Sequence, residues 1–93
     1  GGARCAGAHT VTYVVSTGAS RAPRFGFIVS KQVGSAVVRN TVRRRLKAVC
    51  AQALPDVREG ADIVIRALPS AARSDFADLR DEVERCLRRR AAV

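Results

Sequence analysis

The first 55 residues of this chain contain no acidic side chain, since the first one is Asp56. Long apolar runs are also missing, and none approaches the roughly 20 residues that would cross a bilayer. The opening ten residues are small and polar, unlike a secretory signal peptide. We therefore expect a cytoplasmic protein without a membrane partner.

Metal-ligand spacing is absent as well, because His9 is the one histidine and no Cys-x-x-Cys pair occurs. The three cysteines are widely spaced, and an odd number does not suggest a disulfide framework. We expect Cys50 and Cys86 to be small buried apolar residues, and Cys5 to lie in a loose terminus over residues 1–8.

A catalytic set for a protein enzyme is not visible either. The chain has no GxSxG motif and no phosphate-binding P-loop, and its carboxylates gather between Asp75 and Glu84. A metal-dependent protein nuclease needs several carboxylates that converge on the ion, and the first 55 residues have none. We predict no catalytic residue, no metal site and no small-molecule substrate for this chain.

The cations are distributed unevenly along the sequence. Nine lysines and arginines precede Asp56, and the eight arginines after it balance eight acids, so the net charge of +9 resides in the first 55 residues. Such asymmetry favours a polyanionic partner, with nucleic acid ranked above an anionic membrane. The alternative is a merely soluble, positively charged surface.

Three segments have the composition of strands. Residues 9–16 and 24–30 alternate apolar and polar side chains, and the short link between them predicts an antiparallel hairpin. Residues 61–68 contain a β-branched run and predict a third strand. With two helices between and after them, the order β-β-α-β-α predicts an α+β fold, a small sheet packed by helices, as a single domain over residues 1–93.

The first helix is expected to begin after Ser35, a plausible N-cap, and to end near Leu54, where a proline follows. The second helix is expected to be capped by Ser70 or Ser74 and to reach about Arg90. Its apolar stripe consists of Phe76, Leu79, Val83, Cys86 and Leu87. Its terminal arginines, Arg88, Arg89 and Arg90, suit the helix macrodipole and need no ligand.

The first helix carries the functional signal. At about 100° per residue, one stripe is apolar and comprises Val38, Val42, Leu46, Val49 and Ala53. The other side gathers Arg39, Asn40, Arg43, Arg44 and Lys47, whereas Arg45 falls away from that cluster. Like charges on one face repel each other, and a polyphosphate partner would reverse that cost. A solvated helix face is the alternative, but no acidic residue is placed to relieve the repulsion.

In the segment around this helix, a strand ending in Ser-Lys leads through a Val-Gly turn into a helix with an Arg-Asn-x-x-basic-basic pattern. The pattern is carried by Gly26–Lys31, Val33, Gly34, Ala36–Asn40, Arg43, Arg44 and Lys47. It resembles the signature of the bacterial ribonuclease P protein family, and Asp62–Arg66 and Pro69 also agree with that family.

The resemblance implies a protein subunit of ribonuclease P, an endoribonuclease whose catalytic centre is in an RNA. That RNA performs Mg²⁺-dependent hydrolysis and matures the 5′ end of precursor tRNA, so the implied partners are ribonuclease P RNA and precursor tRNA. The Mg²⁺ would be held mainly by the RNA. The resemblance also implies the ribosomal protein S5 domain 2-like fold, with a left-handed β-α-β crossover.

Two sets of site residues follow from the same resemblance. The implied RNA-binding residues are Arg39, Asn40, Arg43, Arg44, Lys47 and Lys31, and the implied cleft for the single-stranded 5′ leader contains Tyr13, Lys31 and Arg43. From the residues alone, Tyr13 could equally be a core tyrosine and Lys31 an ordinary loop lysine, while Phe25 and Phe27 are expected in the core.

The chain departs from the family pattern in a few places. It starts near the family's first long strand, without the N-terminal helix that lines one wall of the leader cleft, and Gln32, Ser35 and Thr41 replace commoner residues. A ribosomal-type structural RNA-binding protein stays open as an alternative function. A DNA-binding module ranks last, because no helix-turn-helix partner lies at short spacing.

Overall fold

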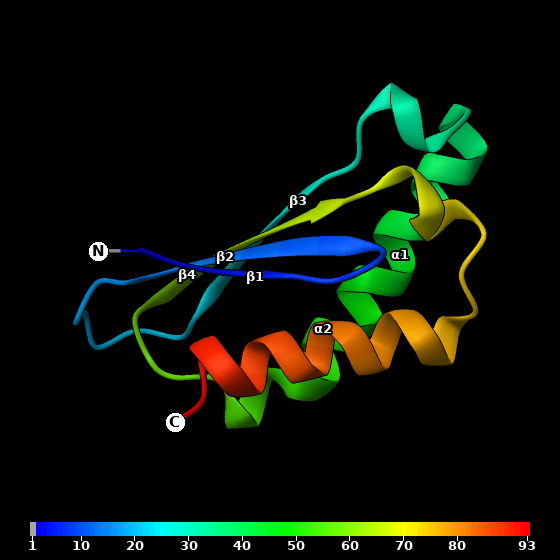
Figure 1. Cartoon of the computed structure of the whole chain (residues 1–93). Helices are drawn as coiled ribbons and strands as arrows, with labels where there is room; N and C mark the ends of the chain where they lie inside the picture. Colours follow the sequence, from blue (N-terminus) through cyan, green and yellow to red (C-terminus); the bar gives the residue numbers. More distant parts are fainter. Residues whose placement is uncertain (1) are drawn as a thin grey trace.

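A computed structural model describes residues 2–93, which form a four-stranded sheet with two helices packed on one of its faces (Figure 1). The α+β class is therefore confirmed. The elements in chain order are β1 (Gly2–Ala6), β2 (Thr10–Ser16), β3 (Arg24–Ile28), η1 (Lys31–Val33), α1 (Ala36–Ala53), η2 (Leu54–Asp56), β4 (Ala61–Ala67), η3 (Pro69–Ala72) and α2 (Phe76–Arg90).

The order of strands across the sheet is β1-β2-β4-β3. β4 is antiparallel to β2 and parallel to β3, so it separates the two strands that we expected to form a hairpin. That prediction is wrong, because the strand with the strongest apolar run takes the central place, where Ile63 and Ile65 are fully buried. The crossover β3-α1-β4 joins adjacent parallel strands, and its left-handed sense stays a prediction.

The N-terminal segment is a strand and not the loose terminus expected for residues 1–8; position 1 lies outside the described residues. β1 pairs with β2 along its whole length, from Gly2 opposite Val15 to Ala6 opposite Val11. Its composition of small residues has no strand-like alternation, so the sequence offered no signal for it.

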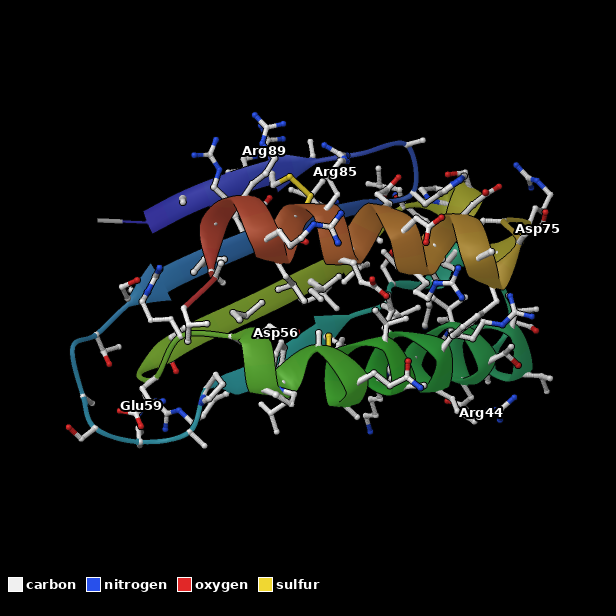
Figure 2. The ribbon with its side chains drawn as sticks, turned by 90° about the horizontal axis from the view of Figure 1, so that it is seen from below. Arg44, Asp56, Glu59, Asp75, Arg85 and Arg89 are labelled. Atoms are coloured by element: carbon white, nitrogen blue, oxygen red, sulfur yellow. A yellow bond between two sulfur atoms is a disulfide. The ribbon has the colours of Figure 1, made fainter. Side chains whose placement is uncertain are left out.

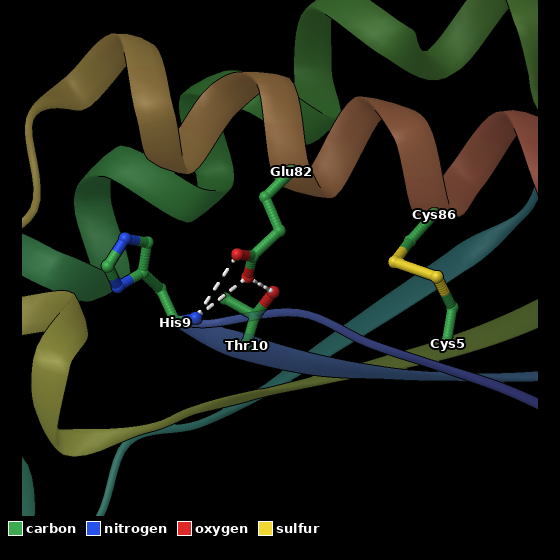
Figure 3. The surroundings of a disulfide bond; sticks show 5 residues. All are labelled: Cys5, His9, Thr10, Glu82 and Cys86. Carbon is green, nitrogen blue, oxygen red and sulfur yellow. Dashed lines mark hydrogen bonds between the residues drawn. A yellow bond between two sulfur atoms is a disulfide. The ribbon is translucent and has the colours of Figure 1, made fainter.

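The cysteine prediction is partly wrong. Cys5 is buried and forms a disulfide with Cys86 of α2, the two Cα atoms lying 5.5 Å apart (Figure 3). The fold brings together two positions separated by 81 residues, which spacing along the chain does not reveal. Cys50 is a free, buried thiol as predicted, and burial raises its pKa to about 12.

Both helices bury their apolar stripes against the same sheet face. Leu46 of α1 and Leu79 of α2 meet Val14 of β2 and Ile65 of β4 in one core. Ser35 caps α1 as predicted, since its side chain accepts a hydrogen bond from the Val38 amide. No helix within residues 2–93 has the length and apolar character that crossing a membrane requires.

The start of α2 differs from the prediction. Asp75 occupies its N-cap position, and neither Ser70 nor Ser74 caps the helix. Ser70 Oγ instead donates to the Ala8 carbonyl at 2.8 Å, and Ser74 Oγ donates to a carbonyl of η3. Phe76, predicted in the apolar stripe, is 40% exposed because it lies in the first turn, beyond the sheet-facing stretch.

Candidate nucleic-acid interface

The basic face of α1, defined by Arg39, Asn40, Arg43, Arg44 and Lys47, points away from the core. The buried side of the helix holds Val42, Leu46 and Val49, which leaves the basic flank on the outside. Within that face, three side chains are exposed and two are half-buried. Figure 2 shows Arg44 extending outward from α1. The helical period therefore predicted this face correctly as a surface.

Most donors on this face are free. Arg39 Nε donates to the Gly34 carbonyl at 3.2 Å, and Arg43 Nη1 donates weakly to Asn40 Oδ1 at 3.4 Å. Among residues 2–93, no carboxylate lies within 4.0 Å of any cation of the face. Uncompensated guanidinium groups on a rigid helix are well suited to phosphate oxygens.

Two other early cations, Arg21 and Arg24, are paired with a carboxylate, unlike the cations of the basic face. Arg21 Nη2 and Arg24 Nε each lie 3.0 Å from Asp62 Oδ1. The hydrogen bond from Arg24 holds the pKa of Asp62 below its ordinary value, and Asp62 in turn raises the pKa of Arg24. Arg45, which we placed off the cluster, reaches from α1 to the Ser74 carbonyl at 3.4 Å.

The turn before α1 carries Lys31. Lys31 is exposed and begins η1, one short turn before the helix. Gly34 has a φ of 155°, and a Cβ atom there would lie 2.9 Å from a methyl group of Val38. The Val-Gly turn thus needs its glycine to bring the strand end and the helix start together.

An apolar pocket of about 190 Å³ adjoins the basic face between α1 and β3. It is lined by Phe25, Phe27, Lys47, Cys50, Ala51 and Leu54. Phe25 and Phe27 pack against the core, as predicted, with their ring centroids 6.5 Å apart. An apolar surface therefore lies beside Lys47, one cation of the basic face.

The sheet face away from the helices is open. Tyr13 and Val15 of β2 are 37% and 48% exposed there, so Tyr13 is not a core tyrosine. The register places Arg4 of β1 directly opposite Tyr13, and Arg66 of β4 opposite Val11. We did not single out Arg4 or Arg66 from the sequence, although the two-residue alternation around Arg66 could have placed it on this face.

The structure does not bring the three leader-cleft residues to one surface. Tyr13 lies on the open sheet face, whereas Arg43 belongs to α1, which packs on the other face. Lys31 lies in η1, the short turn that leads into the start of α1. The candidate interface therefore has two parts, the basic face of α1 and the open face of the sheet.

No group of three or more His, Cys, Asp or Glu side chains comes together within residues 2–93 in a way that could hold a metal ion. We accordingly assign no residue of the described chain to a metal.

Sequence comparison relates the chain to one family. A family model described as Ribonuclease P matches residues 1–91. The protein named "Ribonuclease P protein component" of Nocardia farcinica is 57% identical over 67 residues, which are 72% of this chain and 43% of that protein. Its namesake in Acidothermus cellulolyticus is 44% identical over 89 residues, 95% of this chain and 74% of that protein.

The match covers only part of some relatives. Besides 43% of the Nocardia farcinica protein, it covers 62% of the protein of the same name from Beutenbergia cavernae. Solved structures agree in fold. An RNase P protein from Thermotoga maritima, solved with 1-(4-fluorophenyl)-2-thiourea, superposes with a TM-score of 0.85 at 23% identity, over 95% of this chain and 85% of that one. An RNase P protein of Staphylococcus aureus gives 0.83 at 24% identity, over 94% and 79%.

Proposed function

The chain belongs to the ribonuclease P protein family, and from this premise we propose that it binds the catalytic RNA and the 5′ leader of precursor tRNA. In this role it supports Mg²⁺-dependent maturation of the tRNA 5′ end as the protein subunit of a cytoplasmic ribonucleoprotein. The observation that carries the proposal is the basic face of α1, which has no carboxylate partner in residues 2–93.

The basic face is suited to an RNA backbone. Three arginines offer planar forks for phosphate oxygens, and Lys47 adds a point charge on the same side. Asn40 can donate and accept, which fits a base edge or a ribose hydroxyl. Lys31 extends the same cationic surface across the turn before the helix.

The open sheet face is suited to a single strand. Tyr13 is exposed in the middle of β2, and a base stacked on an aromatic ring contributes about 1–3 kcal/mol. Arg4 and Arg66 lie on the same face and can meet the phosphates of such a strand. We assign the leader to Tyr13 with these two arginines, and we place Lys31 and Arg43 on the side of the catalytic RNA.

The chemistry of cleavage is proposed to reside in the RNA. Mg²⁺, held mainly by that RNA, would supply the activated water and stabilise the leaving oxygen. The residues of this chain bind and orient the two RNAs, and no step of the hydrolysis is assigned to them.

The proposal is tested by cleavage of a precursor tRNA by the ribonuclease P RNA of Nocardia farcinica, at low Mg²⁺ and moderate salt, with and without the chain. Faster cleavage with the chain supports the subunit role. Tight binding to the RNA without faster cleavage would leave the α1 assignment standing and contradict the leader assignment. If the chain neither binds this RNA nor speeds cleavage, the result favours a ribosomal-type structural RNA-binding protein.

A triple variant tests the basic face directly. Replacing Arg43, Arg44 and Lys47 by Ala removes three cations that lie outside the buried stripe, so the melting temperature should hold. Affinity for the ribonuclease P RNA should fall, and the slope of log K against log salt should flatten by about 0.7–0.9 for each phosphate that is no longer neutralised. The slope is measured by filter binding between about 50 and 400 mM KCl. An unchanged slope would contradict the assignment.

A further inference from the structure

The C-terminal half of α2 carries four arginines, Arg85, Arg88, Arg89 and Arg90. The macrodipole favours cations in the last turn, which holds Arg88, Arg89 and Arg90, and it falls off before Arg85. Arg58, from the segment before β4, supplies a further cation at this end, because its guanidinium donates to Arg90 O at 3.1 Å and to Ala92 O at 3.2 Å. The macrodipole therefore does not account for Arg85.

Charge pairing within α2 is selective. Arg80 lies 3.2 Å from Asp81, and Arg88 lies 3.9 Å from Glu84. Glu82 is engaged elsewhere, since it accepts hydrogen bonds from His9 and Thr10 at the β1–β2 turn. Among residues 2–93, the side chains of Arg85 and Arg89 make no ion pair and no hydrogen bond.

Arg85 and Arg89 lie one helical turn apart and extend from the same side of α2, toward β1 (Figure 2). The disulfide fixes this arrangement, because Cys86 follows Arg85 directly and its partner Cys5 follows Arg4. Arg4 and Arg85 are therefore the immediate chain neighbours of two covalently linked residues, and the bond keeps their backbones close together. Arg4 is exposed, and in residues 2–93 it too has no ion pair.

We infer that Arg85 and Arg89 form a second RNA-binding surface, the β1–α2 edge, which contacts a stretch of phosphate backbone distinct from the one on α1. Arg4 continues this surface around the edge strand to the open sheet face. β1 and β3 are the two opposite edges of the sheet, and α1 packs beside β3 whereas α2 packs beside β1. The inference rests on the proposed function, because it takes the same class of partner.

The test uses the full chain and the ribonuclease P RNA of Nocardia farcinica. The double variant Arg85→Gln/Arg89→Gln should bind that RNA on the order of tenfold more weakly, as expected when charge-assisted hydrogen bonds to phosphate are removed. Its salt slope should flatten by about 1.4–1.8, the sum for two phosphates. Arg80→Gln is the matched control, with the same change on the same helix at a guanidinium that is already paired with Asp81.

Hydroxyl-radical footprinting separates the two surfaces. The β1–α2 edge variant should lose protection of one RNA segment, and the triple α1 variant should lose a different one. The single variant Arg89→Gln, at an exposed position, keeps the test valid if the double variant unfolds.

Three results would overturn the inference. If Arg85→Gln/Arg89→Gln and Arg80→Gln bind the RNA as the unaltered chain does, the edge takes no RNA while the proposed function stands. If the variant instead loses only binding to vesicles of phosphatidylglycerol, the edge is a lipid surface. If the unaltered chain fails to bind the RNA at all, the proposed function fails, and the inference fails with it.

Discussion

At the scale of single residues, Leu46 shows how the helix that carries the candidate site is held in place. It lies at the centre of the buried stripe of α1 and is fully inaccessible to solvent. Leu46→Ala should lower the free energy of unfolding by about 2–5 kcal/mol, because it removes buried methyl groups and leaves a cavity. Urea unfolding followed by circular dichroism measures this loss. Val37→Ala, on the same helix but 77% exposed, is the control and should change stability by less than about 0.5 kcal/mol.

Asp62 connects a single residue to acid stability. The hydrogen bond from Arg24, and a further one from Arg21, hold its pKa below the ordinary value, while desolvation opposes them. The stabilisation is fully present above the ordinary pKa, near 3.8, and is lost as pH falls through the lowered pKa of the folded state. Asp62→Asn should therefore show a smaller loss of stability than the unaltered chain as the pH falls from about 4 to about 2, the range below the ordinary carboxyl pKa. An NMR titration that placed the Asp62 midpoint above the ordinary value would contradict this.

At the scale of elements, the β1–β2 turn is held by a carboxylate of α2. Glu82 accepts hydrogen bonds from the His9 amide, at 3.1 Å to each carboxylate oxygen, and from the Thr10 hydroxyl (Figure 3). Gly7 lies so close that a Cβ atom there would overlap the Glu82 carboxyl group. The turn and the helix are therefore fitted to one another.

Glu82→Ala should destabilise the protein by about 1–3 kcal/mol, since it leaves part-buried donors of His9 and Thr10 without their acceptor. Thermal unfolding gives the magnitude, and faster amide exchange at His9 would localise it to the turn. Asp81→Ala, the exposed neighbour on the same helix, should cost less than about 1 kcal/mol, as is usual for a surface ion pair. Equal losses in the two variants would contradict a specific role for Glu82.

The elements also show what the sequence could and could not predict. α1 and its cap were predictable because a serine, an apolar period and a proline mark the helix locally. The strand that pairs with β3 could not be predicted, because a short loop between two consecutive strands favours a hairpin and takes no account of later strands. β4 lies between them in the sheet although it follows α1 in the sequence, and no local rule anticipates that.

At the scale of the whole molecule, one part of the candidate interface could be predicted from the sequence and the other could not. The basic face of α1 follows from one helical period, so its residues could be assigned to one surface before the fold was known. The open sheet face and the β1–α2 edge depend on which strands become neighbours and on which side the helices cover. Arg4 is the clearest example. It lies opposite Tyr13 because β1 is a strand, and the small residues of β1 give no strand pattern in the sequence.

The disulfide links the two ends of the fold and supports the last prediction. It closes a loop spanning 81 positions, and constraining so long a loop in the unfolded chain typically stabilises a protein by about 2–4 kcal/mol. Adding a thiol reductant should therefore lower the melting temperature by on the order of 10 °C or more. Cys5→Ser, which cannot form the bond, should melt at the same temperature with and without reductant.

The same bond bears on the independence of the two proposed RNA-binding surfaces. Because it ties β1 to α2 while α1 lies beside β3, reduction should leave the basic face of α1 intact. A reduced chain with an unchanged melting temperature would contradict a stabilising role for the bond. A reduced chain that also lost its α1 footprint on RNA would show that the two edges of the sheet are not independent.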